Sequence, residues 1–382
     1  MEKIYGLIGE KLGHSFSVPI HAMLGRKEYR LYELRREELA GFLANPNLGG
    51  LNVTIPYKRE VMPYCAQIAP EAQQIGSVNT IVNREGKLWA YNTDLYGFVY
   101  MVQSAGISMQ GKKVLILGNG GTSLTAQAAA KKLGAREVVV MSRRAAVTYA
   151  DLPKHTDSEI LVNTTPVGMY PNNLQAVVEL GAFTNLSGVV DVIFNPARTK
   201  LVLEAAARGI PATGGLKMLV AQAKQAEEYF YGRAIDDARI EEIYRTLSCD
   251  TGNIILTGMP GSGKTSVGRA LAKMMGREAI DIDDEIAQAA GRSIPEIFQS
   301  EGEAGFRARE SAAIREAGKD TGKVIMTGGG AVLREENYAP LKQNGRIYQL
   351  SRDIELLAMG GRPLSTGREA LYAMQEQRAP FY

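Results

Sequence analysis

Cysteine, histidine and tryptophan are scarce in this sequence of 382 residues, which contains two cysteines, three histidines and one tryptophan. Cys65 and Cys249 are too few for a disulfide framework, and this fits a reducing compartment. An excess of charge is also missing, because 44 Lys and Arg residues face 41 Asp and Glu residues and leave a formal net charge of +3. This nearly neutral charge disfavours binding to nucleic acid or to a membrane surface.

Long hydrophobic runs are absent as well. The N-terminus, MEKIYGLIGEKLGHS, lacks the apolar stretch of a signal peptide, and no segment has the length and apolarity needed to span a bilayer. The composition, 45% hydrophobic and 22% charged, is ordinary for a globular protein. We therefore expect a cytoplasmic α/β protein whose partners are small molecules.

Short apolar runs alternate with helical patterns along the whole chain, which predicts parallel sheets joined by crossover helices. The runs lie at residues 4–9, 114–118, 137–142, 160–165, 189–194, 253–258, 278–282, 323–328 and 346–350. They are too many for one sheet, and the length favours two or three domains. We expect domains at 1–100 (completed by helices at about 215–247), 101–214 and 252–382, with a helix at 95–106 and a short Ser/Asp/Thr/Gly linker near Asp250.

The first glycine-rich loop follows the apolar run at 114–118 and reads GNGGTSLTAQ. A strand, a tight glycine turn and a helix form a Rossmann unit, in which the backbone approaches a pyrophosphate at the helix N-terminus. The residues expected to hold a dinucleotide here are Gly118, Asn119, Gly120, Gly121 and Thr122. The glycine pattern alone is also compatible with an ordinary strand–helix turn.

Arginines at the end of the next apolar run indicate which dinucleotide binds. Ser142, Arg143 and Arg144 stand where an NAD site usually has an acid for the ribose 2′-hydroxyl. Guanidinium groups suit a 2′-phosphate, so the pattern favours NADP. The alternative is that both arginines are solvated residues on a surface turn.

Polar residues gather at predicted strand ends in the first hundred residues. Neutral hydrogen-bonding groups, one lysine and one carboxylate suit a small polyhydroxylated substrate, and a lysine held by a carboxylate can protonate a ketone oxygen during hydride transfer. Taken singly, the serines could cap helices, the lysine could be a surface charge and Asp94 could be an N-cap. The residues are Ser15, Ser17, Thr54, Lys58, Asn79, Asn92 and Asp94.

The motifs GHSFSVP, NVTIPYK, GSVNT, YNTD, GNGG and GGLKMLVAQA occur in that order, and over about residues 1–247 the chain resembles the shikimate dehydrogenases. The resemblance implies reduction of 3-dehydroshikimate by NADPH. Lys58 would be the general acid/base with Asp94 as its partner, while Gly215 and the loop around Val192 would lie near the nicotinamide. The residues implied to hold the substrate are Ser15, Ser17, Thr54, Asn79, Asp94 and Gln222.

One residue departs from this family. Phe194, in DVIFNP, stands where the family often has a tyrosine. The resemblance therefore implies that one hydrogen bond to the substrate carboxylate is missing, at a cost in affinity rather than in chemistry.

The second glycine-rich loop, GMPGSGKTSVG, lies between an apolar run and a helical pattern and fits the P-loop signature G-x-x-x-x-G-K-[ST]. Backbone amides would cradle phosphates, Lys264 would reach the β/γ oxygens and the Thr265 hydroxyl would bind Mg²⁺. The residues expected to hold the nucleotide are Gly261, Ser262, Gly263, Lys264, Thr265 and Ser266.

The acids of this region lie at the end of the strand at 278–282, with Asp281 inside it and Asp283 just after it, and not at the end of the strand at 323–328. Two carboxylates at alternate positions can divide the work, one toward the metal and one toward an acceptor hydroxyl. Scattered arginines are usually surface residues, as we expect of Arg309. An acceptor that carries a carboxylate would explain two of the other arginines, which are Arg307, Arg362 and Arg378.

The P-loop, DID, FR, GGG, RPL and RAPFY fall in the order of the shikimate kinases, which residues 252–382 resemble. The resemblance implies that Asp281 supports Mg²⁺, that Asp283 activates the 3-hydroxyl of shikimate and that Arg362 covers the transferring phosphoryl group from a lid. Shikimate would be held by Asp283, Arg307, Gly329, Gly330 and Arg378. Members of the family continue beyond this motif with another strand, an adenine-side loop and a helix, so a C-terminally truncated kinase domain is expected here.

Together the two resemblances predict a bifunctional enzyme, in which shikimate is the product of one site and the acceptor of the other. Alternatives are a quinate-preferring dehydrogenase and an active dehydrogenase joined to an inactive, regulatory or truncated P-loop module. A P-loop regulator of nucleic acid is disfavoured, because the sequence has no basic stripe and no aromatic stacking platform.

Overall fold

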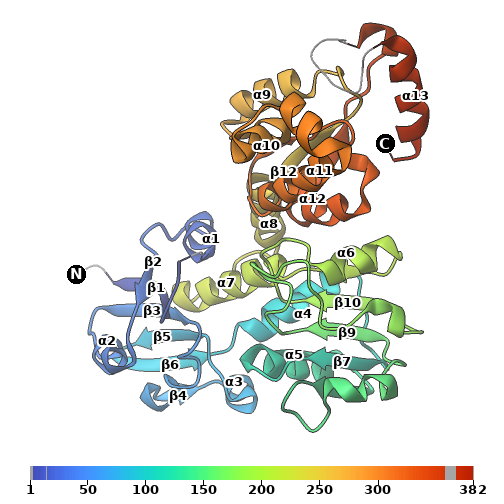
Figure 1. The fold of residues 1–382 in the computed structure, drawn as a ribbon. Helices are drawn as coiled ribbons and strands as arrows, with labels where there is room; N and C mark the ends of the chain where they lie inside the picture. The colour runs from blue at the N-terminus through green and yellow to red at the C-terminus, as the bar shows by residue number, and fades with distance from the viewer. Residues whose placement is uncertain (1–2, 14, 358–366, 382) are drawn as a thin grey trace. The chain divides into compact units, whose positions relative to one another are not determined.

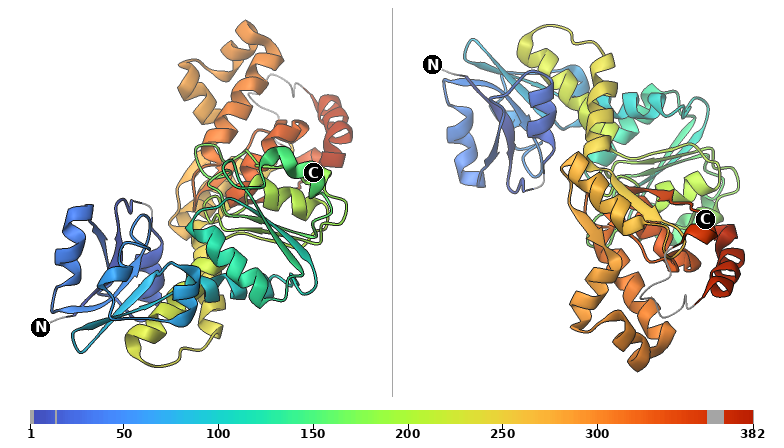
Figure 2. Two further views of the ribbon diagram at one scale, coloured as in Figure 1. Left: turned by 90° about the horizontal axis from the view of Figure 1, so that it is seen from below. Right: turned by 90° about the horizontal axis from the view of Figure 1, so that it is seen from above.

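The computed structural model of the chain describes residues 3–13, 15–357 and 367–381. They form three β-sheets with helices packed against them (Figure 1, Figure 2). None of the helices in these ranges has the length and apolarity to cross a membrane. The chain divides into two compact units, which we call the N-terminal unit (Met1–Val167, Ala176–Asn195 and Glu204–Arg245) and the P-loop unit (Gly168–Gln175, Pro196–Leu203 and Thr246–Tyr382).

The first sheet of the N-terminal unit is mixed, with the strand order β2-β1-β3-β5-β6-β4. Its strands are β1 (Ile4–Gly9), β2 (Arg30–Glu33), β3 (Leu48–Val53), β4 (Gln67–Ile68), β5 (Thr80–Arg84) and β6 (Lys87–Tyr91), and its helices are α1 (Ser17–Met23), α2 (Leu39–Leu43) and α3 (Pro70–Ile75). β3, β5 and β6 pair antiparallel. The expectation of parallel sheets throughout was therefore wrong here, since Glu85 and Gly86, both at positive φ, turn β5 back as the hairpin strand β6.

The second sheet is parallel, with the order β11-β10-β9-β7-β8, as a Rossmann unit requires. Its strands are β7 (Lys113–Leu117), β8 (Glu137–Met141), β9 (Ile160–Asn163), β10 (Gly188–Asp191) and β11 (Ala212–Thr213), accompanied by α4 (Asp94–Ser104), α5 (Gly121–Lys132), α6 (Lys200–Ala207) and α7 (Leu216–Tyr231). All residues of β7, β9 and β10 are buried, because helices cover parallel strands.

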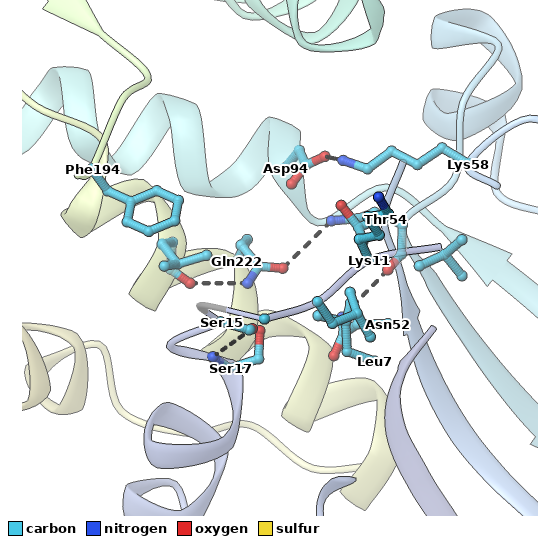
Figure 3. A pocket seen from close by; sticks show the side chains of 15 residues that line it. Leu7, Lys11, Ser15, Ser17, Asn52, Thr54, Lys58, Asp94, Phe194 and Gln222 are labelled. Carbon is cyan, nitrogen blue, oxygen red and sulfur yellow. Dashed lines mark hydrogen bonds and ion pairs between the residues drawn. The ribbon is translucent and has the colours of Figure 1, made fainter. Parts of the chain in front are cut away.

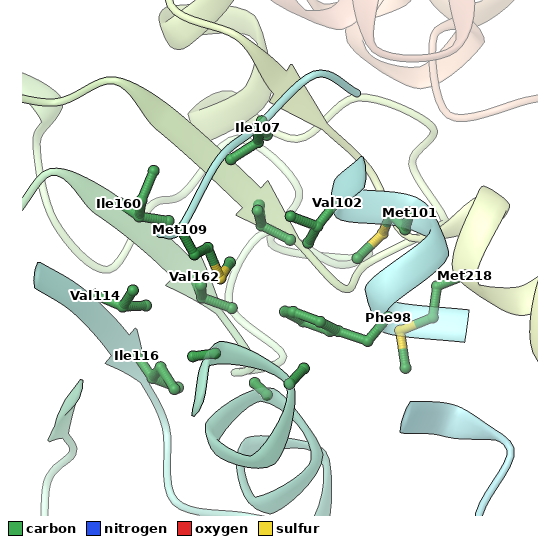
Figure 4. Close-up of a cluster of buried hydrophobic side chains, with 14 of the residues drawn as sticks. Phe98, Met101, Val102, Ile107, Met109, Val114, Ile116, Ile160, Val162 and Met218 are labelled. Carbon is green, nitrogen blue, oxygen red and sulfur yellow. The ribbon is translucent and has the colours of Figure 1, made fainter. Parts of the chain in front are cut away.

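One apolar cluster joins α4 and α5 to a single face of this sheet (Figure 4). Phe98 and Val102 of α4 point toward Ile116 of β7 and Val162 of β9. α4 begins at Asp94, with Thr93 as the N-cap residue, so Asp94 is the first helical residue and not the cap. The core therefore fixes the helix whose first residue lies at the predicted substrate site.

The third sheet belongs to the P-loop unit and is parallel, in the order β13-β14-β12-β15. Its strands are β12 (Asn253–Thr257), β13 (Ala279–Asp281), β14 (Val324–Met326) and β15 (Gly345–Gln349), and its helices are α9 (Lys264–Met275), α10 (Ile282–Ala290), α11 (Ile294–Ala317, kinked at Gly302), α12 (Tyr338–Asn344) and α13 (Arg368–Arg378). α9 packs on one face, and α10, α11 and α12 pack on the other. The α/β fold class predicted from the sequence is confirmed.

The segment before this sheet differs from the prediction. α8 (Ala238–Thr251) runs through the stretch expected to be a Ser/Asp/Thr/Gly linker and leaves only Gly252 before β12. The Thr251 hydroxyl donates to the Leu247 carbonyl oxygen (2.7 Å), and the Arg277 guanidinium donates to the carbonyl oxygens of Cys249 and Gly252. These bonds satisfy the last turn of the helix, so polar residues that favour a loop in isolation remain helical. Short 3₁₀ elements elsewhere cover Arg36–Glu38, Met62–Tyr64, Tyr149–Lys154, Leu180–Ala182, Ala331–Leu333, Glu335–Asn337, Ile354–Leu356 and Ala379–Phe381.

Candidate active sites

A cavity of about 300 Å³ opens in the N-terminal unit, at the carboxyl ends of β1 and β3 and beside α4 and α7 (Figure 3). Its polar lining is mostly neutral: Ser15, Ser17, Asn52, Thr54, Asn79 and Gln222. Its ionisable lining residues are Lys11, Lys58 and Asp94, and its apolar ones include Leu7, Leu12, Phe194 and Leu219. The structure thus brings into one cavity the six substrate-binding residues that the resemblance over residues 1–247 implies. Asn92 does not line it, and its side-chain amide donates to the Ser77 carbonyl oxygen (2.8 Å).

Lys58 and Asp94 form an ion pair at the edge of this cavity (Figure 3). The Lys58 Nζ lies 2.6 Å from Asp94 Oδ2, and the two side chains are 22% and 13% exposed. Asp94 is in the first turn of α4, where the helix dipole favours a carboxylate. A lysine held in this way points its ammonium group into the cavity and can exchange a proton with a bound oxygen.

Buried amide and hydroxyl groups hold the cavity wall. Asn79, 3% exposed, donates to the Thr93 hydroxyl (3.0 Å), and the Thr93 backbone N–H donates back to Asn79 Oδ1 (2.7 Å). The Gln222 side chain donates to the Leu219 carbonyl oxygen (2.9 Å), and its Oε1 faces Asn79 and Thr93. These bonds set the orientation of Asn79 and Gln222 before any ligand arrives.

Phe194 lies in the wall of the same cavity and packs edge-on against Phe16, with ring centroids 5.8 Å apart at 73°. Its ring offers no hydroxyl group. A tyrosine at position 194, which the resemblance leads one to expect, would carry a hydroxyl on the para carbon of this ring. That hydroxyl would make this part of the cavity wall polar.

The first glycine loop connects β7 to α5. Gly118 is buried at a φ of +101°, and a Cβ there would lie 2.8 Å from the Thr164 hydroxyl. Gly120 is the N-cap residue and makes no side-chain cap, and a Cβ on Gly120 or Gly121 would meet no described atom within 4 Å. The first amides of α5 are therefore open to a phosphate, and the residues fit a dinucleotide.

Arg143 and Arg144 follow β8, next to this loop in the sheet, and both are exposed. Ser142 is buried, and its hydroxyl accepts a bond from the Arg144 backbone N–H (3.3 Å). Among the described residues, no carboxylate forms an ion pair with either guanidinium group. Farther along the sheet, a Cβ on Gly215 would lie 2.0 Å from the Val192 carbonyl oxygen, so only glycine allows this close approach.

A second cavity, also of about 300 Å³, lies in the P-loop unit between the loop and the ends of β13 and β14. Gly263, at a φ of +95°, is the N-cap residue of α9 and has no side chain with which to cap that helix. Lys264 donates to the carbonyl oxygens of Gly258 (2.9 Å) and Met259 (3.0 Å). The lining consists of Pro260, Gly261, Gly263, Lys264, Thr265, Ser266, Asp281, Asp283, Thr327, Gly328, Gly329 and Arg352.

Three polar residues meet beside the P-loop. The Thr265 hydroxyl donates to Asp281 Oδ2 (2.8 Å), and Asp281 Oδ1 accepts from the Asp283 backbone N–H (3.1 Å). Hydroxyl and carboxylate oxygens are ligands that Mg²⁺ prefers, so this pair fits the metal of a nucleotide. Asp283 is open to the cavity but crowded by protein atoms on its other sides; this desolvation, and then the carboxylates of Asp281 and Glu310, raise its pKa to about 6.

Two buried arginines lie deeper in the P-loop unit. Arg307 pairs with Glu310 (2.8 Å). A Cβ on Gly330 would lie 2.2 Å from the Arg307 guanidinium, so only glycine at this position leaves room for it. Arg378 is 4% exposed, and its Nε and one terminal nitrogen have no hydrogen-bond partner in the described chain. Arg309 is half-buried and pairs with Glu301 (2.8 Å), while Arg362 lies outside the described residues.

Known proteins match both parts of the chain. Residues 7–81 match the family model of the shikimate dehydrogenase substrate-binding domain. The NADP(+)-dependent shikimate dehydrogenase of Clostridium perfringens is 35% identical over 268 residues, which cover 65% of this chain and 99% of the relative. The chain belongs to the shikimate dehydrogenase family. Residues 260–382 match the family model of shikimate kinase, so the chain joins regions similar to two enzymes.

Solved structures of this dehydrogenase family match the N-terminal part. A chorismate mutase/shikimate 5-dehydrogenase fusion protein from Clostridium acetobutylicum is 34% identical, with a TM-score of 0.62 over 65% of this chain and 97% of that one. Shikimate 5-dehydrogenase from Thermus thermophilus, solved with NADP(H) and shikimate, is 29% identical, with a TM-score of 0.58 over 64% of this chain and 99% of that one. The first of these solved proteins thus belongs to a fusion of a shikimate dehydrogenase with a second enzyme.

The sequence analysis did not single out four polar residues that line the two cavities: Lys11, Asn52, Thr327 and Arg352. Lys11 and Asn52 line the dehydrogenase-like cavity, and Arg352 lines the P-loop cavity. Lys11 lies two residues before the GHSFSVP motif, and Asn52, the next-to-last residue of β3, is the first residue of the NVTIPYK motif, so the sequence could have pointed to both. Arg352 follows β15 and is brought to the P-loop only by the parallel pairing of β15 with β12.

Proposed function

We propose that this chain catalyses both the NADPH-dependent reduction of 3-dehydroshikimate to shikimate and the ATP-dependent phosphorylation of shikimate to shikimate 3-phosphate. The observation that carries the first activity is the Lys58–Asp94 pair, 2.6 Å apart, in a cavity otherwise lined by neutral polar groups. Family membership and the relative solved with NADP(H) and shikimate support it. The second activity is supported by the match to shikimate kinase and by Asp283 beside the P-loop.

In the reduction, NADPH supplies a hydride to the carbonyl carbon. The Lys58 ammonium donates a proton to the carbonyl oxygen and accepts it again in the reverse direction. Asp94 keeps the Lys58 Nζ in place and balances its charge. Ser15, Ser17, Thr54, Asn79 and Gln222 donate and accept hydrogen bonds around the substrate and orient it for the transfer.

Arg143 and Arg144 are proposed to select NADP over NAD by pairing with the 2′-phosphate. Replacing both by alanine is expected to raise the KM for NADP⁺ by about tenfold or more, because each charge-assisted bond to a phosphate is roughly twice as strong as a neutral one. The rate with NAD⁺, which has no 2′-phosphate, should not change. Initial rates of shikimate oxidation with the two cofactors measure both effects; an equal loss with NAD⁺ would show that the arginines act on folding and not on selection.

Phe194 is proposed to leave the substrate carboxylate one hydrogen bond short. The Phe194→Tyr variant is expected to lower the KM for shikimate by about tenfold, because a hydrogen bond to a charged group contributes on the order of 1.5–3 kcal/mol. Its kcat should stay close to that of the wild type, since the hydroxyl does not reach the reacting carbon. Steady-state kinetics on shikimate measure the two constants separately, and Phe16→Tyr, a change in the ring packed against Phe194, is the matched control.

In the phosphorylation, ATP with Mg²⁺ supplies the phosphoryl group. The backbone amides at the N-terminus of α9 and the Lys264 ammonium are proposed to hold the phosphates, and Thr265 with Asp281 to hold the metal. Asp283 orients the 3-hydroxyl of shikimate and accepts its proton. Its pKa of about 6 makes it ionised at neutral pH and a stronger base than an ordinary aspartate.

The acceptor's carboxylate is proposed to bind between the two buried arginines of the P-loop unit. Arg378 keeps buried N–H groups that no described residue satisfies, and such donors are costly until an anion reaches them. Arg307 lies over Gly330, and Gly329 continues the wall to Pro260 of the P-loop. An acceptor held by these groups would place a hydroxyl near Asp283.

Two assays on the purified chain test the proposal: NADP⁺ reduction with shikimate or quinate, and ADP release with shikimate, ATP and Mg²⁺. Turnover in both, with shikimate preferred to quinate, is the expected result. NADP⁺ reduction without ADP release would overturn the kinase half and leave the P-loop unit as an inactive or regulatory module. Faster reduction with quinate would change the substrate of the first half.

A further inference from the structure

A buried charged cluster in the N-terminal unit is formed by Glu227 of α7, His21 of α1 and Arg26. Glu227 and His21 are completely buried, and the Arg26 side chain is 5% exposed. Arg26 Nε donates to both Glu227 oxygens (2.8 and 3.0 Å), and His21 Nδ1 lies 2.6 Å from Glu227 Oε1. One carboxylate thus joins α1, the segment after it and α7 through short bonds that water does not reach.

The protonation states of the three groups follow from this geometry. A carboxylate only accepts hydrogen bonds, so the imidazole proton lies on Nδ1. Burial lowers the pKa of His21, against the opposing effect of Glu227, and the ring stays neutral. Burial disfavours the charge on Arg26, but the Glu227 carboxylate outweighs it and raises the Arg26 pKa. The cluster is therefore a permanent Arg–Glu pair with a neutral histidine attached.

The same helices carry two residues of the cavity. Ser17 precedes His21 by one turn on α1, and Gln222 lies before Glu227 on α7. α1 packs against α7, and Ser17 and Gln222 both line the cavity (Figure 3). Since both helices are fastened to one buried carboxylate, the distance between the Ser17 hydroxyl and the Gln222 amide depends on that carboxylate.

A second path leads from His21 to the cavity wall. The His21 ring stacks on Tyr29, with centroids 3.7 Å apart at 4°. The Tyr29 hydroxyl donates to Asn52 Oδ1 (2.8 Å), and the Asn52 amide donates to the Thr80 hydroxyl (3.1 Å). Asn52 lines the cavity, so the cluster also holds the β3 side of the site.

We propose that Glu227, with His21 and Arg26, forms a positioning unit that sets the spacing of Ser17 and Gln222 and thereby the affinity for the polyhydroxylated substrate. The proposal rests on the dehydrogenase function proposed above. None of the three residues lines the cavity, so their effect on the reaction passes through the helices and Asn52. We therefore expect the cluster to affect binding of the substrate and not binding of the dinucleotide at the glycine loop before α5.

Glu227→Gln is the first test, measured as NADP⁺-linked oxidation of shikimate by the whole chain. The KM for shikimate is expected to rise about tenfold or more, because small displacements of binding groups are costly, while the KM for NADP⁺ stays unchanged. Leu43→Ala, a cavity-forming change in the core of α2, is the control for general loss of stability. An unchanged KM for shikimate in folded Glu227→Gln, or the same rise in Leu43→Ala, would overturn the proposal.

A pair of histidine variants covers the case in which Glu227→Gln does not fold. His21→Asn keeps an N–H donor toward Glu227 and should retain a near-normal KM for shikimate, whereas the KM of His21→Leu should rise as in Glu227→Gln.

A double mutant tests whether the cluster positions Ser17. If it does, Ser17→Ala should raise the KM for shikimate by a smaller factor in the His21→Leu background than in the wild type. Additive effects would contradict positioning. A wild-type chain that does not oxidise shikimate would instead refute the proposed function, so the two failures are distinguishable.

Discussion

Replacing Lys58 by alanine is expected to abolish NADP⁺-linked oxidation of shikimate, with kcat lower by about 10³-fold, because a positioned general acid/base contributes about 10²–10⁴-fold. The Lys58 Nζ is 2.6 Å from Asp94, and no other lysine of the cavity has a carboxylate partner among the described residues. The loss should therefore fall on kcat more than on the KM for either substrate. Absorbance at 340 nm during shikimate oxidation measures it.

Two controls accompany this variant. Lys11→Ala removes the other lysine that lines the cavity and should lower kcat by less than about tenfold, since Lys11 has no partner among the described residues to fix its ammonium group. ADP release by the P-loop unit of the Lys58→Ala chain should match that of the wild type. Near-normal oxidation in Lys58→Ala would remove the general acid/base assignment.

The Asp283→Asn variant is expected to lose phosphorylation of shikimate by at least about 100-fold. Asparagine keeps the shape of the side chain but cannot accept the hydroxyl proton. In the wild type, kcat/KM for ADP release should fall as pH drops through about 6, because the Asp283 carboxylate is then protonated. Desolvation by the surrounding protein and the nearby acidic side chains raise its pKa to about 6. A coupled ADP assay from pH 5 to pH 8 measures the loss and the profile together.

Asp284→Asn is the matched control for Asp283. Asp284 is the next residue in α10, is exposed, pairs with Arg269 (3.0 Å) and does not line the P-loop cavity. Its phosphorylation rate should stay within about twofold of the wild type, since an exposed ion pair contributes about 1 kcal/mol at most. A phosphorylation rate in Asp283→Asn as high as in Asp284→Asn would refute the role of Asp283 as base.

Parallel strands could be predicted from the sequence because their residues are buried on both faces and read as unbroken apolar runs, as in VLIL of β7 and IIL of β12. The first sheet was harder. In its hairpin only β6 alternates buried and more exposed residues, and the turn at Glu85 and Gly86 is a weaker local signal than an Asn-Gly turn. The helical end of α8 was missed because Arg277, distant in sequence, satisfies its carbonyl groups.

Some residues of the candidate sites could be predicted from the sequence, and others could not. Lys58, Asp94, Thr265 and Asp281 lie within motifs that the sequence shows, and the structure brings each pair into contact. The Glu227 cluster carries no such signal, because the charged residue on α7 meets His21 and Arg26 only after α7 has packed on α1. Residues that act only through tertiary contacts form no motif or periodic pattern in the sequence.

The measurement that tests the account most directly starts from 3-dehydroshikimate, NADPH, ATP and Mg²⁺ with the purified chain as the only protein. Mass spectrometry of the products should show shikimate 3-phosphate, with one NADPH oxidised for each molecule formed. Omitting ATP should leave shikimate, and omitting NADPH should leave the starting ketone. Accumulation of shikimate in the complete mixture, with no phosphorylated product, would contradict the claim that one chain carries both activities.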